Sequence, residues 1–124
     1  MPSSRPVYLN LLQIRMPVPA IASILHRLSG VLLFLLLPAF LLLLHYSLNS
    51  AHSFACLQEC LQYPLSKFVL WVMLSSLLYH LIAGIRHLIM DAGFGESLTA
   101  ARWVAYTTLT LNTLGIICLG IWLW

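Results

Sequence analysis

The chain has 124 residues, of which 61% are hydrophobic and only 7% charged, and its formal net charge is +3. A soluble domain carries about a quarter of charged residues, so this composition excludes a soluble protein and indicates an integral membrane protein. The length allows one small domain, residues 1–124, and leaves no room for a separate soluble catalytic module.

Three apolar stretches approach or exceed the length of about 20 residues that crosses the hydrocarbon core of a bilayer. They run over about 21–46, 65–90 and 102–124. Because only bonding within a helix satisfies every backbone group in lipid, we expect each stretch to be helical. The sequence therefore predicts an all-α membrane protein with three transmembrane helices. Pro38 lies inside the first stretch and should bend it mildly.

The segment before the first span is polar and extended, and we expect it to pack at the membrane surface. The first apolar run is too long for a cleaved signal peptide. A cytoplasmic N-terminus puts five arginines inside and only Lys67 outside, which is the orientation that the positive-inside rule favours. This asymmetry explains the positive charge without a nucleic-acid partner. The five arginines are Arg5, Arg15, Arg27, Arg86 and Arg102.

The first span begins with a polar stripe in the sequence SILHRLSG. Helical spacing places Ser23, His26, Arg27 and Gly30 on one face within two turns. Arg27 can neutralise a carboxylate or bond a carbonyl oxygen, and Ser23 offers a hydroxyl one turn earlier. The alternative is a snorkelling arginine beside a capping serine. A histidine and a glycine on the same face favour a binding site.

The loop at about 47–64 carries His52, Cys56, Glu59 and Cys60. Structural zinc sites need four ligands at tighter spacings, so we do not expect a metal site there. Cysteines four residues apart on a helical turn also form disulfides poorly. This loop contributes no functional motif.

The second span ends in HLIAGIRHLIMD, residues 80–91. Ionisable groups at membrane depth are costly and seldom lie there without a function. Neutral imidazole is a standard axial ligand of haem iron. Small residues beside His80 leave space either for a flat macrocycle or for another helix, and both interpretations stay open. The face they share consists of Ser76, His80, Ala83, Gly84, His87 and Asp91.

Helix rise gives an expected depth for each histidine. At 1.5 Å per residue, His80 lies about 15 Å below the cytoplasmic end of its span, and His26 and His87 lie about 5 Å from that end. The other spans offer no histidine at the depth of His80. If His80 binds iron as one of two histidine ligands, the second ligand then belongs to another chain. A shallow pair formed by His26 and His87 is the rival arrangement.

These segments together resemble the cytochrome b subunit of succinate dehydrogenase, the larger membrane anchor of complex II. Arg-Pro at residues 5–6 and Ser-x-x-His-Arg-x-Ser at residues 23–29 fit one family pattern. His-x3-Gly-x-Arg-His at residues 80–87, followed by Asp91, fits the other. The resemblance covers the whole chain, and neither motif departs from the pattern.

The resemblance implies a role for each polar residue. His80 would be the axial ligand of haem b, with the opposite ligand supplied by the smaller anchor subunit. His26 and Arg27 would lie near the haem propionates, where a cation favours the carboxylates. Ser23 and Arg27 would form part of the ubiquinone site. Four residues would support this site or an interface with another subunit: Gly84, Arg86, His87 and Asp91.

The resemblance also implies partners besides the lipid bilayer and the smaller anchor. A flavoprotein subunit would oxidise succinate, and an iron–sulfur subunit would pass electrons on to ubiquinone, as in the tricarboxylic acid cycle and the respiratory chain. This chain would not oxidise succinate itself. Asp91 would pair with Arg86 or with a partner subunit.

Three alternatives to this function remain open. The chain could anchor a quinol:fumarate reductase, which runs the same chemistry in reverse. It could be a haem-free scaffold whose polar faces bind other helices. It could also conduct protons through His80, His87 and Asp91, although the apolar outer half of the second span, residues 68–73, argues against a continuous polar path.

Overall fold

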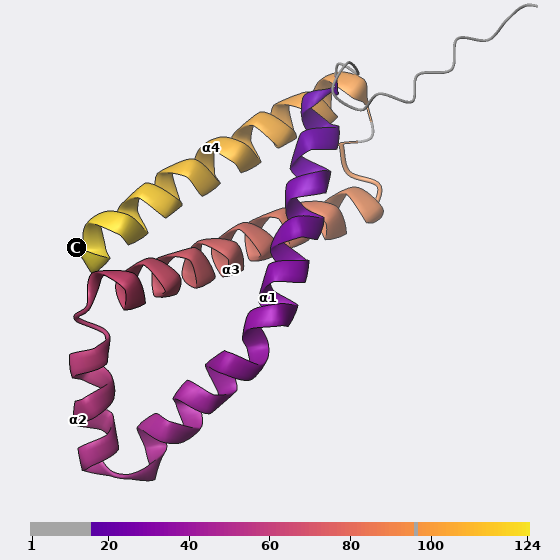
Figure 1. The fold of residues 1–124 in the computed structure, drawn as a ribbon. Helices are drawn as coiled ribbons and strands as arrows, with labels where there is room; N and C mark the ends of the chain where they lie inside the picture. The colour runs from indigo at the N-terminus through magenta and orange to yellow at the C-terminus, as the bar shows by residue number, and fades with distance from the viewer. Residues whose placement is uncertain (1–15, 96) are drawn as a thin grey trace, which may run out of the picture.

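The computed structural model describes residues 16–95 and 97–124, so the Arg-Pro motif at residues 5–6, Arg15 and most of the segment expected at the membrane surface lie outside the described residues. Within these ranges the chain forms four helices and no strands: α1 (Val18–Asn49), α2 (Ala51–Cys60), α3 (Pro64–Asp91) and α4 (Leu98–Leu123) (Figure 1). Helices α1, α3 and α4 are long and apolar enough to cross a membrane. The prediction of an all-α protein with three spanning helices is confirmed.

The three long helices begin at positions that suit a helix start. Pro17 directly precedes α1, and Pro64 is the first residue of α3. At a helix start the fixed φ of proline fits the backbone, and its missing N–H is not needed as a donor. The Ser97 hydroxyl accepts a hydrogen bond from the Ala100 N–H at 3.2 Å and so caps α4. Between α3 and α4 the chain turns at Gly93 and Gly95, whose φ values of 86° and 78° favour glycine.

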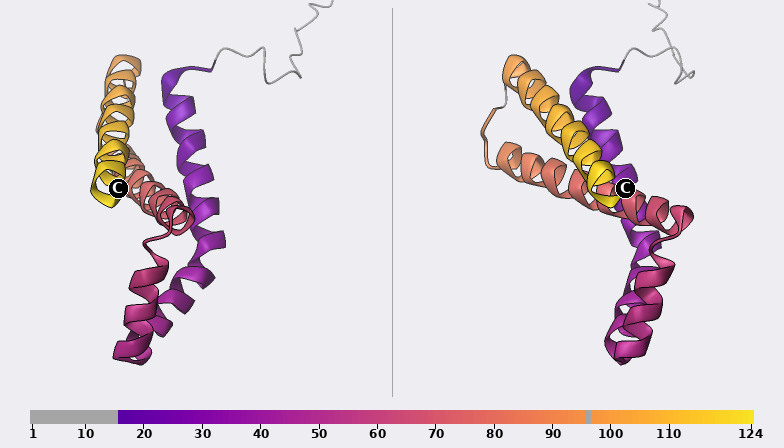
Figure 2. Two further views of the ribbon diagram at one scale, coloured as in Figure 1. Left: turned by 60° about the vertical axis from the view of Figure 1, so that its left-hand side comes forward. Right: turned by 90° about the vertical axis from the view of Figure 1, so that its left-hand side faces the viewer.

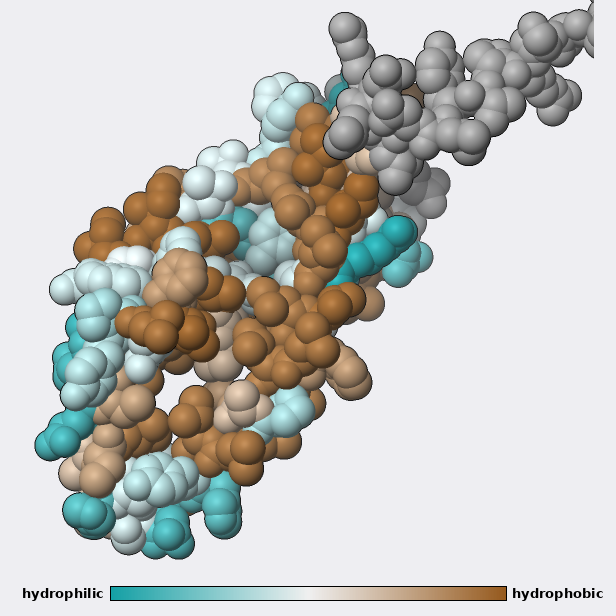
Figure 3. All heavy atoms as spheres, in the orientation of Figure 1, coloured by the Kyte–Doolittle hydropathy of each residue, from teal (hydrophilic) through white to brown (hydrophobic). Residues whose placement is uncertain are grey.

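Helices α1 and α3 cross at an angle, and α4 returns alongside α3 (Figures 1 and 2). Helix α1 runs unbroken through Pro38, and its ribbon changes direction in the half of the helix that leads to α2. Apolar residues cover most of the visible surface of α1, and hydrophilic residues gather at the end of the molecule that carries α2 (Figure 3). This outward apolar surface suits contact with lipid.

Helix α2 lies where the sequence indicated only a loop. The Ser50 hydroxyl accepts a bond from the Ser53 N–H at 3.1 Å, and the Ser53 hydroxyl accepts one from the Ser50 N–H at 2.9 Å. These two reciprocal hydrogen bonds form a capping box at the start of α2. Two serines are a weaker sequence signal for a helix than a periodic pattern of hydrophobic residues. Cys56 and Cys60 remain free thiols, and the Cys56 Sγ lies 3.7 Å from the His52 Nε2.

Small residues allow the spanning helices to approach one another closely. Ala22, Ala83 and Ala105, one from each spanning helix, are at most 1% exposed, although most residues of the bundle face outward. Without a hydrophobic driving force between helices in lipid, close backbone approach at small residues supplies the packing energy. The crossing geometry of the bundle therefore depends on these alanines.

Replacing Ala105 with leucine should lower the stability of the bundle by about 1–3 kcal/mol, because a larger side chain overpacks this contact. The measurement is the midpoint of thermal unfolding of the purified protein in detergent. Ala39→Leu makes the same change at an exposed position of α1 and should leave the midpoint unchanged. Equal midpoints for the two variants would contradict the close packing of α4.

Candidate functional site

Three histidines from α1 and α3 meet where these helices cross. The His26 and His80 rings are stacked, with centroids 4.3 Å apart and planes at 25°. The His26 and His87 ring centroids are 5.1 Å apart, with planes at 36°. The depth estimate allowed His26 to meet His87, but it placed His26 well above His80, and that placement is wrong. Because α1 and α3 cross at an angle, counting residues from the helix ends gives no common depth (Figure 1).

The hydrogen bonds of His80 distinguish its two ring nitrogens. The Ser29 hydroxyl donates to the His26 carbonyl oxygen at 2.7 Å, so its oxygen is free to accept a bond. The His80 Nδ1 lies 3.1 Å from this hydroxyl oxygen and 3.3 Å from the His26 carbonyl oxygen. Since both neighbours accept, the proton belongs on Nδ1, and Nε2 keeps its lone pair for a ligand.

Two glycines lie against the histidine rings. A Cβ atom on Gly30 would meet the His80 Cε1 at 2.9 Å, which is closer than real Cβ contacts allow. A Cβ atom on Gly84 would lie 3.6 Å from the His26 Nε2, an ordinary contact distance. The position of the His80 ring therefore depends on the missing side chain of Gly30, whereas Gly84 lies where α3 packs against His26.

The remaining expected site residues divide into buried and exposed groups. Arg86 is 5% exposed, and its Nε has no hydrogen-bond partner among the described residues. The His26 Nε2 is also buried without a described partner. Ser23 is half-buried, whereas Arg27 and Asp91 are exposed. Within the described ranges no ion pair joins Asp91 to Arg86.

Sequence reasoning assigned no role to Tyr79 or Ser29. The buried Tyr79 hydroxyl donates to the Ala22 carbonyl oxygen at 3.1 Å and joins α3 to the second turn of α1. Ser29 closes the motif at residues 23–29, and Tyr79 immediately precedes His80. Their positions in or next to the two histidine motifs could have marked both residues as candidates. Their hydrogen-bond partners could not be predicted, because these lie more than 50 positions away in the sequence.

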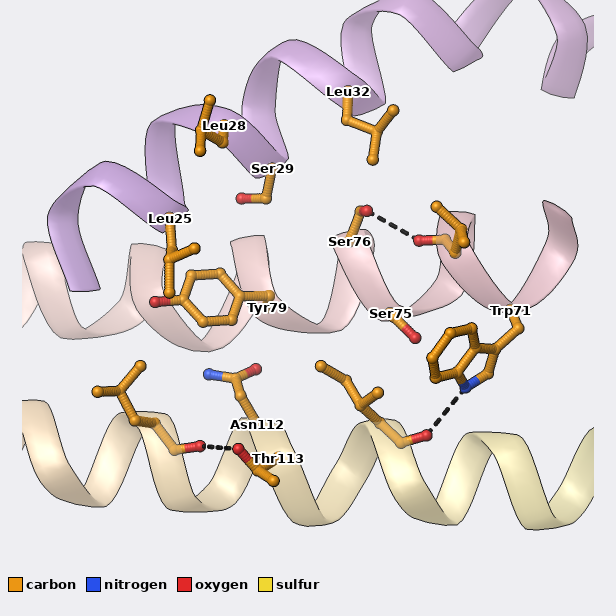
Figure 4. Close-up of a pocket in the computed structure, with 13 residues that line it drawn as sticks. Leu25, Leu28, Ser29, Leu32, Trp71, Ser75, Ser76, Tyr79, Asn112 and Thr113 are labelled. Atoms are coloured by element: carbon orange, nitrogen blue, oxygen red, sulfur yellow. Dashed lines mark hydrogen bonds between the residues drawn. The ribbon is translucent and has the colours of Figure 1, made fainter. Parts of the chain in front are cut away.

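A cavity of about 430 Å³ lies between α1, α3 and α4 (Figure 4). Its walls combine aliphatic and aromatic side chains with several hydroxyl groups, and Asn112 stands between α4 and α3 below the Tyr79 ring. The Asn112 Nδ2 donates to the Thr108 carbonyl oxygen at 2.9 Å, but its Oδ1 has no partner among the described residues. Ser29 also lines this cavity, so it stands between the cavity and the His80 ring.

The histidine cluster does not form a metal site by itself. Over residues 16–95 and 97–124, no group of three or more histidine, cysteine or acidic side chains is arranged to hold a metal ion. The hydrogen bonds of His80 leave its Nε2 as one nitrogen that could bind a metal already held by other groups.

Three helices long and apolar enough to span a membrane, with a half-buried histidine cluster where α1 and α3 cross, define a helical membrane subunit. The sequence profile of the family described as succinate dehydrogenase/fumarate reductase transmembrane subunit matches residues 1–119. The chain belongs to this family.

Several curated relatives are similar over most of their length. The succinate dehydrogenase cytochrome b556 subunit of Coxiella burnetii is 45% identical over 125 residues and covers 100% of both chains. That of Paracoccus denitrificans is 34% identical over 99 residues, or 80% of this chain and 76% of the relative. The cytochrome b560 subunit of Chondrus crispus is 35% identical over 97 residues, or 74% and 75%. The chain is a membrane subunit of this succinate dehydrogenase cytochrome b type.

Proposed function

We propose that this chain binds haem b through His80 and forms part of the ubiquinone-reduction site of a succinate dehydrogenase in the bacterial inner membrane. The observation that carries the proposal is the His80 ring, whose Nδ1 faces two acceptors while its Nε2 is left for iron. The names of the relatives as cytochrome b subunits support the same conclusion.

The surroundings of His80 fit a haem group. Gly30 leaves the space that the imidazole occupies, and His26 offers a buried Nε2 without a described partner. That nitrogen, together with the guanidinium of the adjacent Arg27, would hold the propionate carboxylates. When bound, haem supplies one-electron transfer, and two histidine ligands leave no open coordination position for oxygen.

The second axial ligand would come from the smaller anchor subunit. The His26 ring packs against the rings of both His80 and His87, so its position suits contact with these rings and with the propionates more than a second ligand role. His45 and His52 lie in the half of α1 that leads to α2 and in α2, away from this crossing (Figure 1). In this proposal His80 would supply one ligand, and the partner subunit would supply the other.

The ubiquinone site would lie at the start of α1. The exposed Arg27 and the half-buried Ser23 stand about one turn apart on this helix, close to the histidine cluster. The Ser23 hydroxyl would bond a quinone carbonyl oxygen, and the Arg27 charge would stabilise the negative charge that the quinone gains with electrons. With a cytoplasmic N-terminus, these residues would face the iron–sulfur subunit that delivers the electrons.

The experiment that tests this function is spectroscopy of the purified complex together with its turnover. We expect a low-spin b-type band in the reduced-minus-oxidised spectrum and ubiquinone reduction with succinate as the donor. A complex that contains this chain and shows no b-type haem would support the haem-free scaffold instead. Faster fumarate reduction by quinol than succinate oxidation by quinone would indicate the reverse direction.

A further inference from the structure

We infer that Ser29 is the positioning residue of His80, holding the proton on Nδ1 and setting the strength of Nε2 as a ligand. This inference rests on the proposed role of His80 as a haem ligand. Ser29 is 8% exposed and belongs to α1, whereas His80 belongs to α3, so their contact crosses the interface between the two helices.

The direction of each hydrogen bond follows from the geometry. A serine hydroxyl has one proton, and the Ser29 hydroxyl donates it in a hydrogen bond to the His26 carbonyl oxygen at 2.7 Å. Toward the His80 Nδ1, at 3.1 Å, the same hydroxyl can only accept. The other neighbour of Nδ1 is the His26 carbonyl oxygen at 3.3 Å, which is longer and therefore the weaker acceptor. Ser29 thus makes the stronger of the two bonds to Nδ1.

A plainer explanation is that Ser29 only bonds a carbonyl of its own helix, as serines in helices often do. Ser47 shows that arrangement, since its hydroxyl donates to the Leu44 carbonyl oxygen at 2.7 Å and its bond is exposed. Ser29 differs because it is buried and lies against an imidazole of another helix. Gly30, the next residue, leaves the room in which that imidazole lies.

The bond to Nδ1 has an electronic consequence for a ligand at Nε2. When a histidine binds a metal through Nε2, a hydrogen-bond acceptor on its Nδ1–H raises the basicity of the ring. The more basic ring stabilises the metal in its more highly charged oxidation state. Removing the Ser29 oxygen should therefore weaken His80 as a donor to ferric iron and raise the midpoint potential of the haem. The hydroxyl is not itself a ligand, so haem should remain bound.

The test compares four variants in the purified complex by redox titration of the haem band and by its low-spin electron paramagnetic resonance spectrum. Ser29→Ala and Ser29→Val should both shift the midpoint potential to more positive values and change the g-values, with haem content unchanged. Ser29→Thr keeps the hydroxyl in nearly the volume of valine and should retain the wild-type potential. Ser76→Ala is the matched control, because the Ser76 hydroxyl bonds the Val72 carbonyl oxygen and lines the same cavity as Ser29.

The outcomes separate this inference from the proposed function. Absence of haem from the wild-type complex, or its retention in His80→Ala, would overturn the function and the inference together. Loss of haem in His80→Ala with unchanged potentials and g-values in Ser29→Ala and Ser29→Val would overturn the inference alone. An equal shift in Ser76→Ala, or the same shift in Ser29→Thr as in Ser29→Val, would also overturn it.

Discussion

His80→Ala should abolish the b-type band of the purified complex and reduce its haem content to background. Alanine removes the His80 Nε2, the nitrogen that we propose as the iron ligand, while His80 Nδ1 is the nitrogen that faces Ser29 and the His26 carbonyl oxygen. The His26 ring is nearest, but it lies face to face with the His80 ring. The measurements are the reduced-minus-oxidised spectrum and the ratio of haem to protein.

Two further histidine variants serve as controls for this prediction. His45 is exposed on α1, and His45→Ala should keep the full haem content. His87 touches the His26 ring without facing the acceptors that bind His80, and His87→Ala should keep the band as well. An unchanged spectrum in His80→Ala would show that the ligand has been misassigned, and a band lost only in His87→Ala would favour the shallow rival site.

Arg27→Leu should reduce ubiquinone reduction about ten- to hundredfold while leaving succinate oxidation by an artificial dye acceptor nearly intact. A hydrogen bond to a charged group contributes about 1.5–3 kcal/mol, and each 1.36 kcal/mol of transition-state energy corresponds to a tenfold rate. The dye takes electrons from the other subunits before they reach the quinone. The ratio of the two activities in membranes is therefore the measurement.

The charge rather than the bulk of Arg27 should decide this effect. Arg27→Lys keeps a cation without the planar fork of donors and should give an intermediate rate. Arg102→Leu removes an exposed arginine near the start of α4 and should leave both activities unchanged. If Arg27→Leu abolished the dye-linked activity together with quinone reduction, the residue would be needed for assembly and not for quinone binding.

The spanning helices could be predicted because their length is set by the bilayer. Three apolar runs were expected at about 21–46, 65–90 and 102–124, and the observed helices agree within four residues at each end. Helix α2 could not be predicted in the same way. It is only 10 residues long, and it begins with hydrogen bonds between two serines. No periodic pattern of hydrophobic residues in the sequence indicates this helix.

The site residues were predicted as types and motifs, but their mutual arrangement was not. The sequence placed His26 and His80 on polar faces of two helices, and the structure stacks their rings 4.3 Å apart. The error in depth arose because α1 and α3 cross at an angle, and their packing buries small residues such as Ala22 and Ala83. Such contacts join residues far apart in the chain, and local patterns do not encode them.

The sequence by itself determined that this chain spans a membrane, how many helices do so, and which motifs carry its histidines and arginines. Composition and helical spacing suffice for this, since water and lipid impose the same constraints on every helix. Only the tertiary structure decided that Ser29 and the His26 carbonyl oxygen hold the His80 Nδ1, and that Gly30 makes room for the ring. These contacts depend on how two helices cross, and packing between distant residues sets that crossing.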